Sequence, residues 1–250
     1  MRSVTFQRTE IIPNKIVCVG KNYAAHIEEM GSVASDQMTV FMKPNACISD
    51  QLVADRGEKI HFEAEICLLI QGGAVAGVGV GLDLTKRATQ KRLKDAGLPW
   101  ERAKAFEGSA VFSPFVGTPA SLTDVELELY VDGEIRQRGG PRQMLYKPHI
   151  ILEELCSFIP LEDGDIVMTG TPSGVGPVER DALFKARLLH AHTELVSASW
   201  RECKDKCKGS RALTSLRLYE FRSSINSSIS AVVVVNDVTK RYALGKDGQA

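Results

Sequence analysis

The sequence predicts an α+β fold in which short strands outnumber a few short helices. Short apolar runs recur along the chain and are separated by Gly and Pro residues, as is typical of strands and turns. Helical patterns are expected at residues 23–30, 85–96 and 148–158. The alternating run 127–131 is followed by Asp132-Gly133, a pair that is typical of a tight hairpin turn.

The first expected elements are a strand and a helix near the N-terminus. Residues 16–19 form an apolar run that ends at Gly20, and the helical pattern at 23–30 ends at Gly31. The remaining expected elements, in chain order, are strands at 40–42, 66–70 and 127–131, a helix at 85–96 closed by Gly97 and Pro99, and a helix at 148–158.

The composition indicates an ordinary globular protein. The 250 residues are 44% hydrophobic and 25% charged, and the net charge is zero because Lys plus Arg and Asp plus Glu both number 31. Bulk electrostatics therefore favours neither a nucleic-acid nor a membrane partner. The N-terminal residues lead into no apolar signal core, and no apolar run is long enough to cross a membrane. We expect a cytoplasmic protein, with reduced thiols in apolar surroundings at Cys18, Cys47, Cys67 and Cys156.

The last fifty residues differ in character from the rest. Residues 201–209 are highly charged, residues 223–228 are polar and low in complexity, and residues 231–235 alone suggest a strand. We therefore expect a main catalytic domain over 1–200 and an atypical tail over 201–250 that packs poorly on it. A zinc site at Cys203 and Cys207 is disfavoured, because two thiols fall short of four ligands.

A pair of glutamates beside a buried strand carries the strongest chemical indication. Glu63 and Glu65 lie two residues apart, so in a strand they share a face, with Cα atoms roughly 6.6 Å apart. Two carboxylates beside a core repel each other and resist desolvation, which a divalent cation would relieve. Asp83, at the end of another apolar strand, is a plausible third ligand. The alternative is that both glutamates face solvent on an edge strand.

Three further motifs carry possible chemistry, each with a plain structural alternative. His26 and Glu29 share a helix face, an arrangement that suits a general base for water but also a solvated surface pair. Lys104 either stabilises an oxyanion near the metal or extends along the surface. The loop after strand residues 166–168 is rich in Gly, Thr and Pro, and either binds an anionic group or forms a rigid turn.

Together these segments resemble the fumarylacetoacetate hydrolase family, over roughly residues 15–200. The branch that the chain most resembles contains small acylpyruvate hydrolases and oxaloacetate decarboxylases or tautomerases. The matching segments, in the family's order, are VCVGKNYAAH at 17–26, FEAE at 62–65, LDLT at 82–85, GLPW at 97–100 with KAF at 104–106, DGE at 132–134 and TGTPSGVG at 169–176.

The resemblance implies a mostly-β mixed roll with a few short helices, commonly a homodimer, and a cofactor of Mg²⁺ or Mn²⁺, with Ca²⁺ as an alternative. The roles that it implies are metal ligation by Glu63, Glu65 and Asp83, water activation by His26 and Glu29, contact of Lys104 with a substrate oxygen, and substrate binding by Arg87, Gln90 and Thr171.

The implied activity is metal-dependent hydrolysis of a C–C bond in acylpyruvate-type 2-oxo acids. The alternatives are oxaloacetate decarboxylation or keto–enol tautomerisation at the same site, and a catalytically silent metal-binding homologue. This chain departs from the family's pattern at Phe62, where many relatives have His, and at Ala88, where an acidic residue usually follows Arg. The link at 71–76 between the two carboxylate-bearing strands is also shorter than usual, and we expect it to leave those strands with less surface cover.

Overall fold

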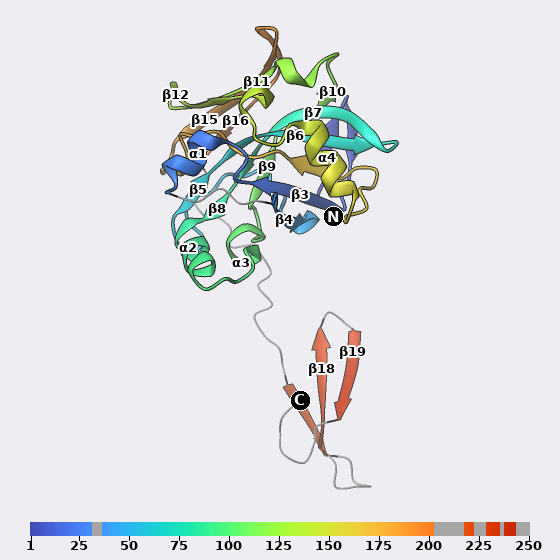
Figure 1. Cartoon of the computed structure of the whole chain (residues 1–250). Coiled ribbons are helices and arrows are strands. Elements are labelled where there is room, and N and C mark those ends of the chain that lie inside the picture. The colour runs from blue at the N-terminus through green and yellow to red at the C-terminus, as the bar shows by residue number, and fades with distance from the viewer. Residues whose placement is uncertain (32–36, 203–217, 223–228, 236–237, 244–250) are drawn as a thin grey trace. The chain divides into compact units, whose positions relative to one another are not determined.

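The computed structural model describes residues 1–31 and 37–202, together with strands at 218–222, 229–235 and 238–243. The chain divides into two compact units, Met1–Lys204 and Asp205–Ala250, which are described separately (Figure 1). All the residues singled out above as candidate ligands or catalytic groups lie in the larger unit.

The larger unit is built on a curled mixed sheet, with seven strands among the described residues. Its members are β3 (Lys15–Gly20), β4 (Thr39–Pro44), β6 (Ala64–Gln71), β7 (Ala74–Asp83), β9 (Ala110–Phe112), β10 (Val116–Gly117) and β13 (Ile166–Met168). The strand order is β10-β7-β6-β13-β3-β4, and β9 also pairs with β7. β13 runs parallel to β3, and the other pairs are antiparallel.

A second sheet, which is antiparallel, packs on one face of the first. Its strands are β11 (Val125–Val131), β12 (Glu134–Gly139), β15 (Leu183–His190) and β16 (Thr193–Arg201), in the order β12-β11-β15-β16. The main apolar cluster joins the two sheets and includes Leu68 and Val80 from the first with Leu127 and Leu188 from the second. Burial of each such side chain contributes roughly 1.5–3 kcal/mol to folding, so this core anchors the strands that carry the candidate site.

Short elements complete the larger unit, with α2 and α3 close together at one end (Figure 1). The short strands are β1 (Val4–Phe6) paired with β2 (Thr9–Ile11), and β5 (Ile60–Phe62) between β8 (Thr85–Lys86) and β14 (Gly176–Pro177). The helices are α1 (Ala24–Glu29), α2 (Arg87–Asp95), α3 (Glu101–Lys104) and α4 (Pro148–Cys156), with 3₁₀ turns η1 (Asn45–Cys47), η2 (Leu122–Asp124) and η3 (Pro141–Gln143).

The alternation of side chains along β6 and β7 gives the large sheet two different faces. On one face Leu68 and Val80 enter the main core. On the other face Gly79 and Gly81 leave room for aromatic rings, since an added Cβ would lie 3.1 Å from Phe115 and 2.8 Å from Phe112. Residues 63, 65 and 83 have the same parity as these glycines. The three carboxylates therefore lie on one face of the strand pair.

Most of the expected elements are confirmed, with shifts at their ends. The helix expected at 85–96 begins at Arg87, because residues 85–86 pair with β5 instead. The helix expected at 148–158 ends at Cys156. The hairpin at Asp132-Gly133 is confirmed, and both residues have the positive φ angles, 50° and 87°, that a tight turn requires.

One expectation about the carboxylate-bearing strands is corrected, and the structure defines the link between them. Glu63 is not inside a continuous strand, because β5 ends at Phe62 and β6 begins at Ala64 in a different sheet. The link at 71–76 is a short hairpin connection. The two strands extend through it to a turn at Gly72-Gly73, whose φ angles of 62° and 72° suit glycine. The strands are therefore paired up to their turn.

The smaller unit contains an antiparallel sheet in the order β17-β18-β19, made of Leu218–Arg222, Ile229–Val235 and Val238–Ala243. The strand expected at 231–235 lies in β18, and the sequence did not predict its two neighbours. Cys203 and Cys207 lie outside the described residues, as does the polar run 223–228. Of the thiols expected in apolar surroundings, Cys18, Cys47 and Cys67 are buried, whereas Cys156 is exposed. None of the described helices is long and apolar enough to span a membrane.

Candidate functional site

Three buried carboxylates converge where β5, β6 and β7 meet. One oxygen each from Glu63, Glu65 and Asp83 lies within 4.8 Å of the others. The Asp83 backbone N–H donates a 2.8 Å hydrogen bond to the Glu63 carbonyl oxygen, which continues the β6–β7 register past the end of β6. Glu65 lies on a strand flanked by β7 and β13 and is 2% exposed. The alternative of solvent-facing glutamates on an edge strand is therefore wrong.

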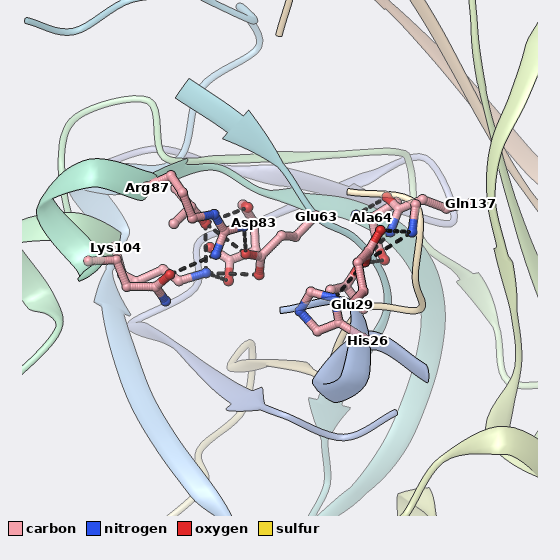
Figure 2. A network of polar contacts seen from close by, with 12 residues as sticks. His26, Glu29, Glu63, Ala64, Asp83, Arg87, Lys104 and Gln137 are labelled. Atoms are coloured by element: carbon pink, nitrogen blue, oxygen red, sulfur yellow. Dashed lines mark hydrogen bonds and ion pairs between the residues drawn. The ribbon is translucent and has the colours of Figure 1, made fainter. Parts of the chain in front are cut away.

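The Lys104 ammonium joins two of these carboxylates. Its Nζ donates hydrogen bonds of 2.9 Å to Glu63 Oε2, 2.6 Å to Asp83 Oδ2 and 2.7 Å to Thr85 Oγ1. Lys104 is 1% exposed, so the alternative of a lysine extended along the surface is wrong. Arg87 approaches Glu63 from α2, with Nη2 2.5 Å from Oε1 (Figure 2). Glu63 is thus held between two cations.

A second buried lysine, which the sequence analysis did not identify, contacts both Asp83 and Lys104 without lining the pocket. Lys43 is fully buried, with its Nζ 2.9 Å from Asp83 Oδ1, and it donates a hydrogen bond to the Lys104 carbonyl oxygen. The Lys43–Asp83 contact is an ion pair without hydrogen-bond geometry, so among the described residues Asp83 Oδ1 accepts no hydrogen bond. The alternation along β4 could have revealed Lys43, because it shares the buried face of Phe41 while Met42 is exposed.

Glu65 is in a different electrostatic environment from its neighbours. Its Oε2 accepts a 2.6 Å hydrogen bond from the Gly170 backbone N–H. Burial raises the pKa of Glu65 well above its ordinary value, and the negative charges of Asp83 and Glu63 raise it further. In the absence of a bound cation, Glu65 therefore favours the protonated form.

The cations have the opposite effect on Glu63. Burial opposes ionisation of this carboxyl group, but Lys104 and Arg87 outweigh burial and hold the pKa of Glu63 well below its ordinary value. Burial likewise opposes the charge on Lys104, and the carboxylates of Asp83 and Glu63 nevertheless raise the pKa of its ammonium group. Glu63 and Lys104 therefore remain an ion pair at neutral pH.

The predicted dyad of His26 and Glu29 is formed on α1. His26 Nδ1 lies 3.2 Å from Glu29 Oε2, and the Gly174 backbone N–H donates a 3.0 Å hydrogen bond to Glu29 Oε1 (Figure 2). His26 is 8% exposed, which excludes the alternative of a solvated surface histidine. Only glycine fits at Gly174, because its φ is +99° and an added Cβ would lie 1.8 Å from the Arg136 carbonyl oxygen. The Gly-rich loop therefore orients the glutamate that orients His26.

One pocket brings the predicted residues together. The predicted residues in its lining are His26, Glu63, Glu65, Asp83, Arg87, Gln90, Lys104 and Thr171. Glu29 does not line the pocket and acts on it through its contact with His26. Arg87 Nη1 donates a 2.7 Å hydrogen bond to Gln90 Oε1, so the two α2 side chains are fixed against each other. Phe41 and Trp100 form an apolar part of the wall.

A second residue that sequence reasoning missed, Gln137, joins the Gly-rich loop to the strand break. Gln137 Oε1 accepts a 2.9 Å hydrogen bond from the Ala64 N–H, and its Nε2 donates bonds of 2.8 Å to Thr171 Oγ1 and 2.7 Å to the Pro172 carbonyl oxygen. The Thr171 hydroxyl donates to the Ala64 carbonyl oxygen at 2.8 Å. Ala64 separates the two glutamates, so these bonds set their spacing. No local motif marks Gln137, which comes from β12.

The donor set fits a hard divalent cation. Three carboxylates on one face, with an Asp83 oxygen that accepts no hydrogen bond among the described residues, are the oxygen ligands that Mg²⁺, Mn²⁺ and Ca²⁺ prefer. When all three carboxylates are ionised, Lys43, Lys104 and Arg87 balance their negative charges. A bound divalent cation would therefore leave the pocket positively charged, which suits an anionic ligand.

The sequence comparisons identify the family. Residues 15–202 match the family described as fumarylacetoacetate (FAA) hydrolase C-terminal. The chain belongs to this family. It is 40% identical over 188 residues to oxaloacetate tautomerase YcgM of Escherichia coli (strain K12), covering 66% of this chain and 84% of that protein. It is 32% identical over 241 residues to the mitochondrial oxaloacetate tautomerase FMP41 of Saccharomyces cerevisiae, covering 77% and 93%.

The fold agrees with that of a solved structure. Fumarylpyruvate hydrolase from Pseudomonas aeruginosa, in complex with Mn²⁺ and pyruvate, matches with a TM-score of 0.72 and 31% identity over 80% of this chain and 95% of that one. The expected mostly-β roll with short helices is confirmed. The roles of the individual site residues, the homodimer and the 1–200 catalytic boundary stay predictions.

We predict that metal will rescue the loss of Lys104. In Lys104→Met, Glu63 and Asp83 lose their shared cation, and the free energy of unfolding of the metal-free protein should fall by about 3–5 kcal/mol. Saturating Mn²⁺ should raise the free energy of unfolding of Lys104→Met by more than it raises that of the wild type, because in the variant the ion also replaces the missing positive charge. Tryptophan fluorescence reports the transition, since both tryptophans, Trp100 and Trp200, lie in the larger unit.

The matched control is Lys15→Met, because Lys15 pairs with buried Asp165 at 2.5 Å outside the carboxylate cluster. This variant should be destabilised without rescue by Mn²⁺. An equal shift on adding Mn²⁺ to the wild type and both variants would contradict the assignment of the metal to this cluster.

Glu65 should make the metal-free protein less stable as pH rises. Because its folded pKa is raised above 4.5, its favourable contribution is fully present below pH 4.5 and is lost as pH rises toward the folded value. Glu65→Gln has no carboxyl group at this position, so its stability lacks this pH dependence. In EDTA, the free energy of unfolding of the wild type should therefore fall relative to that of the variant as pH increases above 4.5. Denaturant titrations at a series of pH values measure the difference. A constant difference would show that Glu65 is ionised in the folded protein.

Proposed function

We propose that the chain is a divalent-metal-dependent enzyme that interconverts the keto and enol forms of oxaloacetate. The observation that carries the proposal is that a carboxylate triad, a buried lysine and an oriented histidine line one pocket. The curated relatives at 40% and 32% identity are named oxaloacetate tautomerases, which favours this reaction over the hydrolysis that the sequence suggested first.

Tautomerisation requires one group that moves a proton and another that stabilises an enolate. His26 is suited to the first task, because Glu29 holds Nδ1 and leaves Nε2 to take a proton from substrate carbon C3 and deliver it to the 2-oxo oxygen, or to carry out the reverse transfer. Glu29 also favours the charged imidazolium that forms during the transfer. Neither step consumes water, so this reaction needs only the pocket and its lining.

The buried cations are suited to the second task. A divalent cation, held by Glu63, Glu65 and Asp83, would supply Lewis acidity that polarises the 2-oxo group. The Lys104 ammonium would stabilise the negative charge that develops on the substrate oxygen through its own positive charge, because its three N–H donors are already engaged. Arg87 and Gln90 would hold the substrate carboxylate with N–H donors, in a position fixed by their mutual hydrogen bond.

The second candidate is the hydrolysis of acylpyruvates. It is favoured by the His26–Glu29 dyad, which could equally activate water, and by the similarity to a solved fumarylpyruvate hydrolase. Water would add to the distal carbonyl group, the C–C bond would break, and Lys104 would stabilise the pyruvate enolate that leaves. A catalytically silent homologue would bind metal at the same carboxylates without turnover.

We predict that His26→Ala lowers the rate of oxaloacetate tautomerisation by about 10²–10⁴-fold, which is typical of a lost acid–base group. Affinity for Mn²⁺ should be unchanged, since the triad is intact. The ultraviolet absorbance of enol-oxaloacetate measures the rate of tautomerisation in the presence of Mn²⁺, Mg²⁺ or EDTA. Under the same conditions, the loss of acetylpyruvate absorbance measures hydrolysis. His149→Ala is the control, because this histidine is exposed on α4.

The outcomes separate the candidates. The proposal is supported if EDTA abolishes tautomerisation and His26→Ala strongly lowers its rate. Loss of acetylpyruvate without any effect on oxaloacetate would transfer the assignment to the hydrolase. Metal binding with no turnover of either substrate would leave the silent homologue, and full tautomerase activity in His26→Ala would contradict the assigned role of this residue.

A further inference from the structure

A group of basic side chains surrounds the mouth of the pocket. Lys21, Arg87 and Lys94 line both the pocket that holds the carboxylates and the adjoining outer depression, together with Met30 and Gln90. These residues therefore mark the boundary between the deep site and solvent. All three cations are partly buried, so their charges are less screened than those of fully exposed side chains.

Helix geometry explains how two of these cations reach the same pocket. Arg87, Gln90 and Lys94 are spaced three and four residues apart on α2, so they share one helix face. Arg87 contacts Glu63 in the deep site, and Lys94 follows about two turns further along the helix. Lys21 lies just after β3, in a left-handed conformation with φ of 58°.

Lys94 lies within electrostatic reach of both Lys21 and Arg87. Burial lowers the pKa of Lys94, and repulsion from Lys21 and Arg87 lowers it further, against the attraction of Asp95 and Glu63. Two acidic residues, Asp95 and Glu58, also line the outer depression. Asp95 pairs with Lys91 at 2.6 Å, and Glu58 accepts hydrogen bonds from the Thr89 N–H and hydroxyl. An anionic group at the mouth would relieve the repulsion among the cations.

We propose that Lys94 and Lys21 bind the distal carboxylate of a dicarboxylic 2-oxo acid, and so select dicarboxylates over monocarboxylates. The inference rests on the proposed function, in which the 2-oxo group and its neighbouring carboxylate bind in the deep site. A substrate held there by Arg87 and Gln90 would extend along α2 toward Lys94. Arg87 and Gln90 would thus serve every 2-oxo acid, whereas the two lysines would serve only substrates with a second negative end.

The test compares two stable 2-hydroxy acids that differ by the distal carboxylate. Calorimetric titration of the Mn²⁺-loaded full chain with malate and with lactate measures both affinities, in the wild type, Lys94→Gln and Lys21→Gln. Each variant should weaken malate binding by about 10-fold or more, as expected for one charge-assisted hydrogen bond. Lactate binding should change by less than about 2-fold. Lys185→Gln, exposed on β15, is the control for bulk charge.

The possible failures are distinguishable. Equal weakening of both ligands, or no weakening of malate, would overturn the inference even if the wild type tautomerises oxaloacetate. A wild type that prefers malate, with the preference lost in the variants, supports the dicarboxylate site even if oxaloacetate is not turned over, and that result would count against the proposed function alone. In an active enzyme, the same variants should raise KM for oxaloacetate and leave kcat within about 3-fold.

Discussion

The site depends on one buried arrangement, in which the Lys104 ammonium is hydrogen-bonded to both Glu63 and Asp83. Ionised carboxylates are costly to bury without a partner. Lys104 supplies the charge, Lys43 fixes both Asp83 and the Lys104 carbonyl from behind, and Arg87 holds the other side of Glu63. Of these groups, Lys104 and Arg87 also line the pocket, where they would face an anionic substrate.

The architecture of the sheet delivers these groups with little special geometry. Alternation along β6 and β7 puts the carboxylates on one face, while the opposite face fills the main core. The strand break at Glu63 lets β5 pair with β8 and β14, and Gln137 fixes that break against the loop that carries Thr171. That loop also donates to Glu65 through Gly170. Fold stability and site geometry therefore share the same hydrogen bonds.

Local sequence patterns predicted the early strands, the hairpin turn at Asp132-Gly133 and the approximate positions of the helices, because each of these features depends on residues that are close in sequence. The shared face of Glu63 and Glu65 was also predictable, since it needs only a period of two. The strand break was not, because β5 has partners that are distant in sequence. Alternation along β4 could have indicated that Lys43 is buried, but neither its role nor that of Gln137 was predictable. Their roles arise from tertiary contacts with Asp83 and Ala64 that no local motif encodes.

The central claim is that the carboxylate cluster is a divalent-metal site, and direct titration with Mn²⁺ tests it. Electron paramagnetic resonance of free Mn²⁺ should reveal a single site per chain, weakened about 10-fold or more in Glu65→Gln and Asp83→Asn. Glu128→Gln, which alters a buried carboxylate paired with Arg187 at 2.6 Å, should bind as the wild type does. Unchanged Mn²⁺ affinity in Glu65→Gln and Asp83→Asn would contradict the account.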